Sequence, residues 1–222
     1  MKKIEVFICV ANEDISHARE LRRILTDCYG FDVFLYDHAI VPSDDFIKEI
    51  IQHLKSCQIF VPLISVSLKQ SSFCNQEIGF IINQDTRIFP ISIDKTEPYA
   101  LIDHVYRLKC NAQDEHGILK AATEFFHIVT CHKNFKPLSY GAVNGLVEAL
   151  KISLNPLTTS GIVFMLEITQ DEISLSKKQL NDIIWAIKNN PHVYNAGHYY
   201  DRLRILLNGK YRIGKYRISI DA

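Results

Sequence analysis

Short β-branched, apolar segments alternate with amphipathic segments along residues 5–129, and this alternation restricts the fold more than any other feature of the sequence. The apolar segments predict strands at residues 5–11, 32–37, 58–65 and 87–94, with residues 104–110 as a plausible fifth. The amphipathic segments predict helices at residues 15–28, 44–54, 72–82 and 114–129. Strands that alternate with helices at this spacing predict an α/β domain with a parallel five-stranded sheet and helices on both faces.

Glu77 places a carboxyl group where the helical pattern calls for an apolar residue. If Ser72 is the N-cap, successive residues turn by about 100°, and Glu77 falls within one apolar arc whose other members are Phe73, Cys74, Ile78, Phe80, Ile81 and Ile82. Burying a carboxylate costs several kcal/mol unless it is paired or borders a wet cleft. Two interpretations stay open. Either Glu77 pairs with a basic side chain or caps a buried backbone group, or it belongs to a functional site.

The predicted topology gives Glu77 a place near a ligand. In open parallel sheets, ligands bind beyond the carboxyl ends of the strands. Here those ends are residues 9–12, 36–38 and 65–72, so Glu77 is expected to face the crevice. Phe73 precedes Glu77 by one helical turn, so its ring and the carboxyl group are neighbours on the same face.

Charge and cysteine content change together near residue 132. Residues 1–131 contain 13 Lys and Arg against 18 Asp and Glu, a net −5, whereas residues 132–222 contain 12 against 7, a net +5. All six cysteines lie in the first part. These shifts predict a first domain of residues 1–131 and a second, smaller domain of residues 132–222. The second is predicted to be α+β, with helices at 141–153, 176–189 and 198–207, an ambiguous segment at 162–168, and a strand at 216–220.

The sequence argues against several classes of protein. No apolar run approaches the ~20 residues of a membrane span, and the amino terminus lacks the pattern of a signal peptide, which predicts a cytoplasmic protein. His127, Cys131 and His132 would suit a metal, but no fourth ligand follows at a usual spacing, so neither a metal nor another cofactor is expected. The basic, tyrosine-rich carboxyl-terminal segment is better explained as a solvated face than as a nucleic-acid surface.

Residues 4 to about 130 resemble a Toll/interleukin receptor (TIR) domain of the bacterial NAD⁺-cleaving type. The resemblance rests on three segments in order: residues 7–14 (FICVANED), residues 37–46, and residues 71–77 (SSFCNQE). It implies a flavodoxin-like sheet. It also implies that the helix glutamate, which matches Glu77, is catalytic in those members that are enzymes. The sequence departs from the family pattern at five positions. Cys9 replaces a serine, Val10 a tyrosine or histidine, and Ser43 a glycine. Phe46 and Phe73 each replace a tryptophan.

The residues and the resemblance together predict that the protein is an NAD⁺ glycohydrolase or ADP-ribosyl cyclase, with NAD⁺ as its substrate. Breaking the bond from ribose to nicotinamide builds positive charge on the sugar while the pyridine leaves neutral, so one carboxylate, that of Glu77, is enough. Phe73 would stack on a flat ring of the substrate. The other predicted substrate contacts are Phe7, Cys9, Asn12, Asp37 and His38, with a core position the better explanation of Phe7 taken alone.

Three functions are weighed on this basis. The leading hypothesis is a bacterial antiphage defence enzyme that depletes NAD⁺ or makes an ADP-ribose messenger for an effector protein, and that self-associates through its TIR domain. The alternative is a non-catalytic scaffold that joins protein partners. A nucleoside deoxyribosyltransferase-like enzyme would also use a glutamate, but no second acidic motif supports it.

Overall fold

The computed structural model of the chain describes residues 3–36 and 44–209. Contacts divide the chain into two compact units. We call residues 4–26 and 31–125 the sheet unit, and the described residues of the other unit, 3, 27–30 and 126–209, the helical unit. The division falls between Phe125 and Phe126, whereas the change in composition lies near residue 132.

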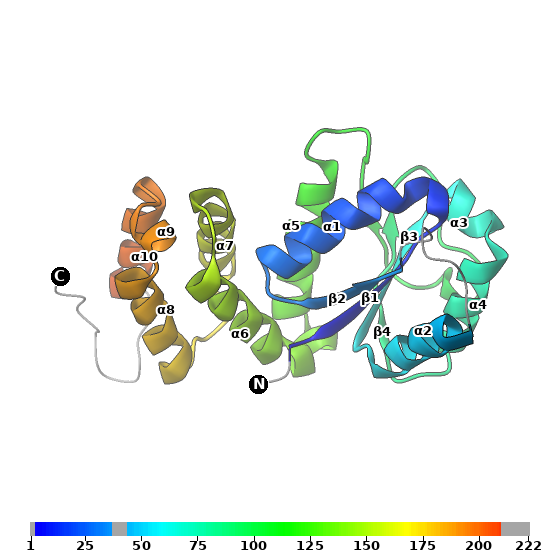
Figure 1. Cartoon of the computed structure of the whole chain (residues 1–222), viewed down its shortest axis with the longest axis horizontal. Helices are drawn as coiled ribbons and strands as arrows, with labels where there is room; N and C mark the ends of the chain where they lie inside the picture. The colour runs from blue at the N-terminus through cyan, green and yellow to red at the C-terminus, as the bar shows by residue number, and fades with distance from the viewer. Residues whose placement is uncertain (1–2, 37–43, 210–222) are drawn as a thin grey trace. The chain divides into compact units, whose positions relative to one another are not determined.

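The sheet unit is built on parallel strands in the order β2-β1-β3-β5-β6, of which Figure 1 labels β1, β2 and β3. The strands are β1 (Glu5–Cys9), β2 (Asp32–Leu35), β3 (Ile59–Ile64), β4 (Arg87–Ile88), β5 (Ile91–Ser92) and β6 (Leu108–Lys109). In the central pairs, Val6 lies opposite both Val33 and Ile59. This order is that of flavodoxin-like folds: β2 is added on one side of β1 and the later strands on the other, so the strand order, not the strand direction, reverses between β1 and β3. The predicted fold class is therefore confirmed.

The predicted fourth strand is interrupted at Pro90. Its first half, β4, pairs with Ile59 and Phe60 of β3, and its second half, β5, pairs with Leu63 and Ile64 of the same strand. Proline has no N–H to give to a ladder, which accounts for the break. The sheet therefore has six strands that occupy five positions.

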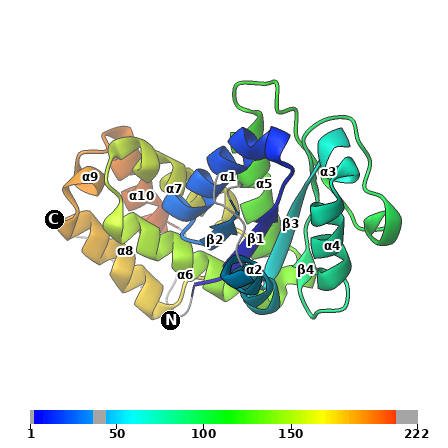
Figure 2. The same cartoon turned by 45° about the vertical axis from the view of Figure 1, so that its right-hand side comes forward.

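Helices cover both faces of this sheet. One face carries α1 (Ile15–Asp27) and α5 (Gly117–Cys131), and the other carries α2 (Asp44–Ser56), α3 (Val66–Gln70) and α4 (Ser72–Ile81) (Figures 1 and 2). On the first face, the ring of Phe125 packs edge-on against Phe31 and Phe89, with centroids 5.7 and 4.8 Å away. On the second face, one apolar cluster joins β1 and β3 to the helices, and its members include Phe7, Phe60, Ile64, Ile50, Leu54, Leu68, Cys74, Ile78 and Ile81.

The connections between elements contain three short 3₁₀ helices. They are η1 (Asn12–Asp14), η2 (Ala100–Ile102) and η3 (Lys133–Phe135). Of the residues predicted to form a fifth strand, 104–110, only β6 is extended and paired, and η2 ends just before that segment. The predicted bounds of α1, α2, α4 and α5 agree with the structure to within three residues, which is the usual uncertainty at frayed helix ends.

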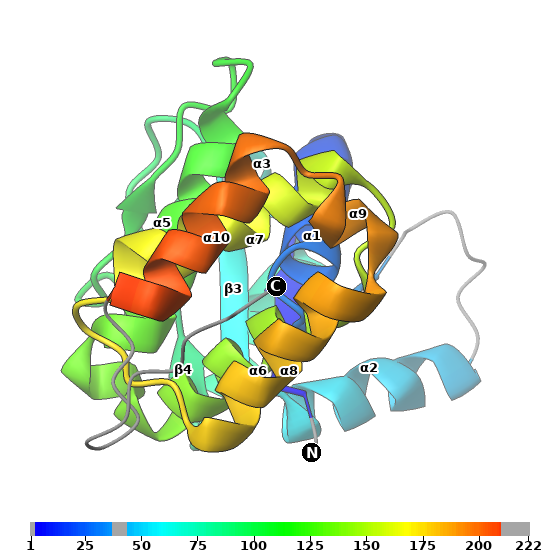
Figure 3. The ribbon, with the colours of Figure 1, turned by 90° about the vertical axis from the view of Figure 1, so that its left-hand side faces the viewer.

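The described part of the helical unit contains helices and no strand. They are α6 (Lys136–Ile152), α7 (Pro156–Thr169), α8 (Lys177–Asn189), α9 (Pro191–Tyr194) and α10 (His198–Gly209), with α8 packed on α6 and α10 on α7 (Figure 3). The ambiguous segment 162–168 is helical, within α7. The strand predicted at 216–220 lies outside the described residues.

Two side-by-side glycines fix the start of this unit. Gly30 has a φ of +71°, and a Cβ built on it would lie 2.1 Å from the carbonyl oxygen of Gly145 in α6. Only glycine fits a position that combines the left-handed region with so close a backbone approach. Residues 27–30 therefore pack with α6 although they lie far from it in the sequence.

Within residues 3–36 and 44–209, no helix combines the length and the apolar character that crossing a lipid bilayer requires.

Candidate functional site

Helix α4 begins directly where α3 ends, and Ser71 serves both helices. Its side chain accepts a hydrogen bond from the backbone N–H of Cys74 at 3.3 Å, so Ser71 is the N-cap of α4. The sequence prediction of Ser72 as the cap was wrong by one residue. Both are serines, a residue type that favours this position, and only the backbone decides between them: Ser71 is extended whereas Ser72 is already helical.

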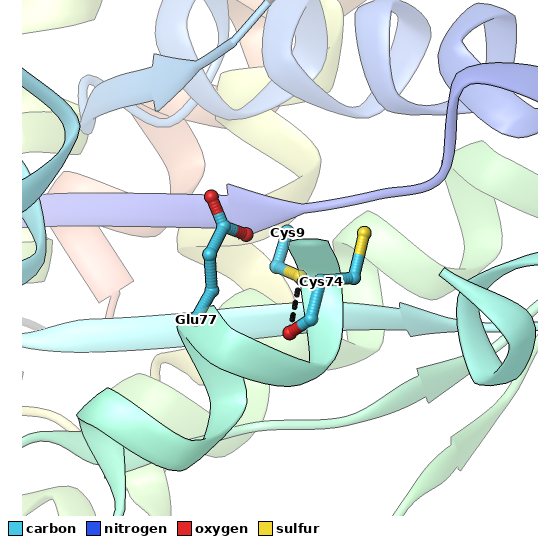
Figure 4. A group of neighbouring side chains, drawn as sticks. All are labelled: Cys9, Cys74 and Glu77. Atoms are coloured by element: carbon cyan, nitrogen blue, oxygen red, sulfur yellow. Dashed lines mark hydrogen bonds between the residues drawn. The ribbon is translucent and has the colours of Figure 1, made fainter. Parts of the chain in front are cut away.

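Glu77 is buried on the face of α4 that packs on the sheet. Its side chain is 6% exposed, which confirms that the carboxyl group lies on the inner face. Figure 4 shows the side chain extending from α4 toward β1, where Cys9 is the last residue. The Glu77 carboxylate and the thiols of Cys9 and Cys74 all lie within 4.8 Å of one another.

The two thiols have different environments. Cys9 is 1% exposed, and its Sγ lies 3.9 Å from the carbonyl oxygen of Cys74, to which it donates (Figure 4). The same thiol also interacts with the Glu77 carboxylate. Burial raises the pKa of Cys9 well above its usual value. The pKa of Cys74 is lowered, first by its hydrogen bond with Cys9 and then by Ser71, against the opposing effect of burial.

Burial dominates the acidity of Glu77. It raises the pKa of the carboxyl group to about 8; the interaction with Cys9 opposes this rise and the neighbouring Cys74 adds to it. Among the described residues, no basic side chain forms an ion pair with Glu77. The described residues thus provide no basic partner of the kind that would explain a purely structural buried carboxylate. At neutral pH the carboxyl group is mostly protonated.

Two aromatic side chains lie near the start of α4. Phe73 is half-buried and packs against the apolar cluster of the sheet, and its ring centroid lies 6.4 Å from that of Tyr36. Tyr36 follows β2 and is the last residue described before position 44. It lay at a predicted strand end, but nothing in its sequence context marked it as a partner of Phe73.

The other predicted contacts fall into three groups. Phe7 is 1% exposed, and its ring lies 5.2 Å from Phe34 and 5.6 Å from Phe60, so the structure gives it the core position rather than a substrate contact. Asn12 is exposed in η1, beyond the end of β1. Asp37 and His38 lie outside the described residues.

Two hydrogen-bond groups at the strand ends were not anticipated from the sequence. Ser65, at the end of β3, donates to Asp14 at 2.6 Å and caps α3 by accepting from Leu68 N at 3.0 Å. Asp14 belongs to segment 7–14, and its position just beyond a strand end is the sequence signal for such a contact.

The second group holds the junction of α3 and α4. The Tyr99 hydroxyl donates to Asn75 Oδ1 at 2.7 Å, and the Asn75 amide donates to the carbonyl oxygens of Lys69 and Ser71, at 3.1 and 2.8 Å. No sequence pattern linked Tyr99 to α4.

Two of the hollows on the described part of the sheet unit are lined by residues other than Glu77. A hollow of about 740 Å³ lies beside α3 and is lined by Val66, Lys69, Gln70, Thr96, Glu97 and Pro98. Another, of about 560 Å³, is lined by His104, Val105, Tyr106, Arg107, Lys109 and Glu124. In the conformation observed, neither of these hollows gives a ligand access to the Glu77 carboxyl group.

Comparisons with known proteins identify the sheet unit. Among curated proteins, none matches this chain. Among solved structures, the chain is similar to the TIR domain of the Toll-related receptor TRR-2 from Hydra magnipapillata, with 16% identity and a TM-score of 0.44 over 54% of this chain and 95% of that one. The family model described as the TIR domain matches residues 6–121, more than half of the sequence. The chain therefore belongs to the TIR domain family.

Proposed function

We propose that the protein is an NAD⁺ glycohydrolase or ADP-ribosyl cyclase in which Glu77 is the catalytic residue. The observation that carries the proposal is the buried carboxyl group of Glu77, which has no basic partner among the described residues and points toward the carboxyl end of β1. Such a group costs folding free energy, and a functional role accounts for its presence.

One carboxylate meets the chemical demand of this reaction. As the bond between ribose C1′ and the nicotinamide nitrogen breaks, its electron pair leaves with the nicotinamide, which departs neutral. The sugar becomes oxocarbenium-like, and Glu77 in its ionised form stabilises the positive charge. Water then adds at C1′ and releases a proton, or a nucleophile within ADP-ribose closes a ring. Neither route needs a cofactor.

The raised pKa fits this role once the substrate is considered. A carboxyl group with a pKa of about 8 is mostly neutral in the free protein at pH 7. The nicotinamide ring of NAD⁺ carries a positive charge, and a positive charge within a few Å favours the ionised form of a carboxyl group. Substrate binding would therefore produce the carboxylate where it is needed.

The remaining contacts follow from the proposed pose. Phe73 offers the face of an aromatic ring one helical turn before Glu77, and the Cys9 thiol lies within 4.8 Å of the carboxyl group. Asn12, Asp37 and His38 stay as proposed contacts from the loops that follow β1 and β2. We place the activity in bacterial antiphage defence inside the cytoplasm, where the reaction either depletes NAD⁺ or makes an ADP-ribose messenger for an effector protein.

A non-catalytic scaffold is the second candidate, and one observation favours it. Glu77 is 6% exposed, so the site must open further before a substrate can contact its carboxyl group. A scaffold that presents its outer helices to protein partners needs no such opening.

The test is to incubate the purified chain with NAD⁺, with and without a crowding agent, and to separate nicotinamide, ADP-ribose and cyclic products by chromatography. The matched pair of variants is Glu77→Gln and Glu124→Gln, the second of which changes an exposed glutamate on α5. Nicotinamide release by the natural chain and by Glu124→Gln, reduced about a hundredfold or more in Glu77→Gln, supports the enzyme. No release under either condition favours the scaffold, and release undiminished in a folded Glu77→Gln protein overturns the role of Glu77.

A further inference from the structure

Three side chains with metal-binding atoms converge in the helical unit. His127 and Cys131 lie one turn apart on α5, so both project from the same side of that helix. Glu172 comes from the connection between α7 and α8, and its Oε1 lies 3.2 Å from Nε2 of His127. The imidazole nitrogen, the Cys131 sulfur and a carboxylate oxygen of Glu172 all lie within 4.8 Å of one another.

From this geometry we infer that His127, Cys131 and Glu172 form a binding site for a divalent metal ion of the zinc class. The sequence alone offered no further ligand, because Glu172 is remote from His127 in the chain. The fold supplies it. The site is independent of the proposed NAD⁺ chemistry and uses none of the residues assigned to it.

The spacing of the three atoms suits a tetrahedral ion. Zinc binds cysteine sulfur, histidine nitrogen and carboxylate oxygen at about 2.0–2.3 Å, which places neighbouring ligand atoms about 3.5 Å apart. The separation of His127 Nε2 and Glu172 Oε1, 3.2 Å, is already close to this value, and no two of the three ligand atoms are more than 4.8 Å apart. A water molecule would complete the fourth position.

The supporting residues hold two of the three ligands in place. Glu172 and the next residue, Ile173, both donate backbone hydrogen bonds to the carbonyl oxygen of Thr169, each at 3.0 Å, and Ile173 is buried. Cys131 lies in the last turn of α5, next to buried Thr130, whose hydroxyl lies 2.9 Å from the Phe126 carbonyl oxygen and 3.3 Å from the Cys131 sulfur. The backbone around the site is therefore fixed before any ion binds.

Solvent can reach the site. The side chain of His127 is 37% exposed and that of Glu172 is 49% exposed, while Cys131 is half-buried. The donor set also selects the ion. Thiolate and imidazole favour Zn²⁺ and its neighbours in the transition series over Mg²⁺ and Ca²⁺, which prefer oxygen ligands.

The neighbouring His132 provides a matched control. It is exposed, and its Nδ1 accepts a hydrogen bond from the backbone N–H of Asn134 at 3.3 Å as the N-cap of η3. It therefore lies next to Cys131 in the sequence without joining the three ligands. Cys28 is the matched thiol, since it is half-buried like Cys131 and belongs to the same unit.

The experiment titrates the metal-free full-length chain with Co²⁺ and then with Zn²⁺. We expect one Co²⁺ per chain, with a charge-transfer absorption band in the near ultraviolet that reports a cysteine thiolate bound to cobalt, and loss of that band when Zn²⁺ displaces it. Cys131→Ser should abolish the band, and His127→Gln and Glu172→Gln should each weaken Zn²⁺ binding by at least the ten- to hundredfold that loss of an outer-shell partner costs. His132→Gln and Cys28→Ser should bind as the natural chain does.

The cluster of Cys9, Cys74 and Glu77 also holds three ligand types, so Cys9→Ser is a further control. A cobalt band that survives in Cys131→Ser and disappears in Cys9→Ser overturns the proposal, as does failure of the natural chain to bind either ion. Since Glu172 is exposed, Glu172→Gln is expected to fold normally.

A second readout is the thermal midpoint of unfolding, which should rise by about 5 °C when the Zn²⁺ concentration is a hundredfold above its Kd. A rise of the same size in Glu172→Gln would also contradict the site.

Discussion

The thiol of Cys9, the last residue of β1, lies within 4.8 Å of the carboxyl group of Glu77 on α4, inside the layer between the sheet and the helix. The interaction favours the ionised carboxylate and opposes the effect of burial. Among the described residues, Cys9 is therefore the one whose substitution should change the pKa of Glu77 most directly.

Substitutions at Cys9 should change the pKa of Glu77 in opposite directions. Cys9→Ser supplies a stronger hydrogen-bond donor and should lower the pKa from about 8, whereas Cys9→Ala removes the donor and should raise it. The measurement is a carbon-13 NMR titration of the carboxyl signal that is absent in Glu77→Gln. If the protein is active, kcat/KM should rise with pH through the same value and shift with it. Identical titrations in both Cys9 variants would show that the thiol does not affect Glu77.

The pH dependence of stability should carry the signature of a buried acid. The folded-state pKa of Glu77, about 8, exceeds the ordinary value of 4.5. Between these values the folded chain binds more protons than the unfolded chain, so stability is fully present below pH 4.5 and is lost as pH rises through 8. Glu77→Gln should remove this loss and raise the free energy of unfolding at pH 8.5 by on the order of 3 kcal/mol.

Urea denaturation at pH 5 and at pH 8.5 measures this effect. The exposed Glu124→Gln should leave both midpoints unchanged. A Glu77→Gln protein that is less stable than the natural chain at both pH values would show that the carboxyl group has a stabilising partner.

The two serines before α4 should differ in their effect on stability. Ser71→Ala removes the side chain that accepts from Cys74 N, and it should cost about 1 kcal/mol. Ser72 lies exposed in the first turn, and Ser72→Ala should change the stability by less than about 0.5 kcal/mol. Chemical denaturation compares the two variants directly, and equal costs would contradict the assignment of the cap.

Replacing Phe73 by a larger aromatic residue should preserve activity, whereas removing the ring should reduce it. The side chain is half-buried against the sheet and lies near Tyr36. If it stacks on the substrate, Phe73→Trp keeps NAD⁺ cleavage, whereas Phe73→Ala raises KM or lowers kcat/KM by about tenfold. The thermal midpoint of each variant separates this effect from loss of packing. An alanine variant with normal kinetics would limit Phe73 to a structural role.

The elements that were predicted correctly are specified by residues within or directly next to them in the sequence. Each of the first three strands is a short β-branched run, and α8 begins at a capping box in which Ser176 and Gln179 bond each other's backbone. Segment 162–168 was ambiguous because its apolar residues fit either period. The signals that settle it lie earlier, where Asn155 caps α7 and Pro156 begins it. Helix α3 was missed because five residues are too few to show a helical period.

The candidate site was predictable only in part, because its members come from separate elements. The helical pattern placed Glu77 inward, and the burial agrees. Its neighbour Cys74 was visible only as one more apolar position. The bond from Ser65 to Asp14 and that from Tyr99 to Asn75 depend on tertiary contacts. Phe7 is the opposite case, a predicted substrate contact that the structure places in the core. It lies at the centre of β1, within the family motif, and its ring packs between those of Phe34 and Phe60.

Association between chains should control the activity, and the charges of the two parts of the sequence suggest how. Residues 1–131 carry a net −5 and residues 132–222 a net +5, so the acidic part of one chain attracts the basic part of another. Because Glu77 is only 6% exposed in the single chain, we expect contact with a neighbouring copy to favour a more open site. NAD⁺ cleavage per molecule should then rise with protein concentration and fall with added salt.

The full chain is the proper object for this test, because residues 27–30 belong with the helical unit and a fragment ending at residue 131 would leave Gly30 without Gly145. Lys177 and Lys178 are exposed at the start of α8, where acidic residues are tolerated by the helix dipole. Reversing both to glutamate should reduce the dependence on concentration, while changing both to arginine should preserve it. Rates strictly proportional to concentration in the natural chain, with equal activity per molecule in both variants, would rule out clustering as the control of activity.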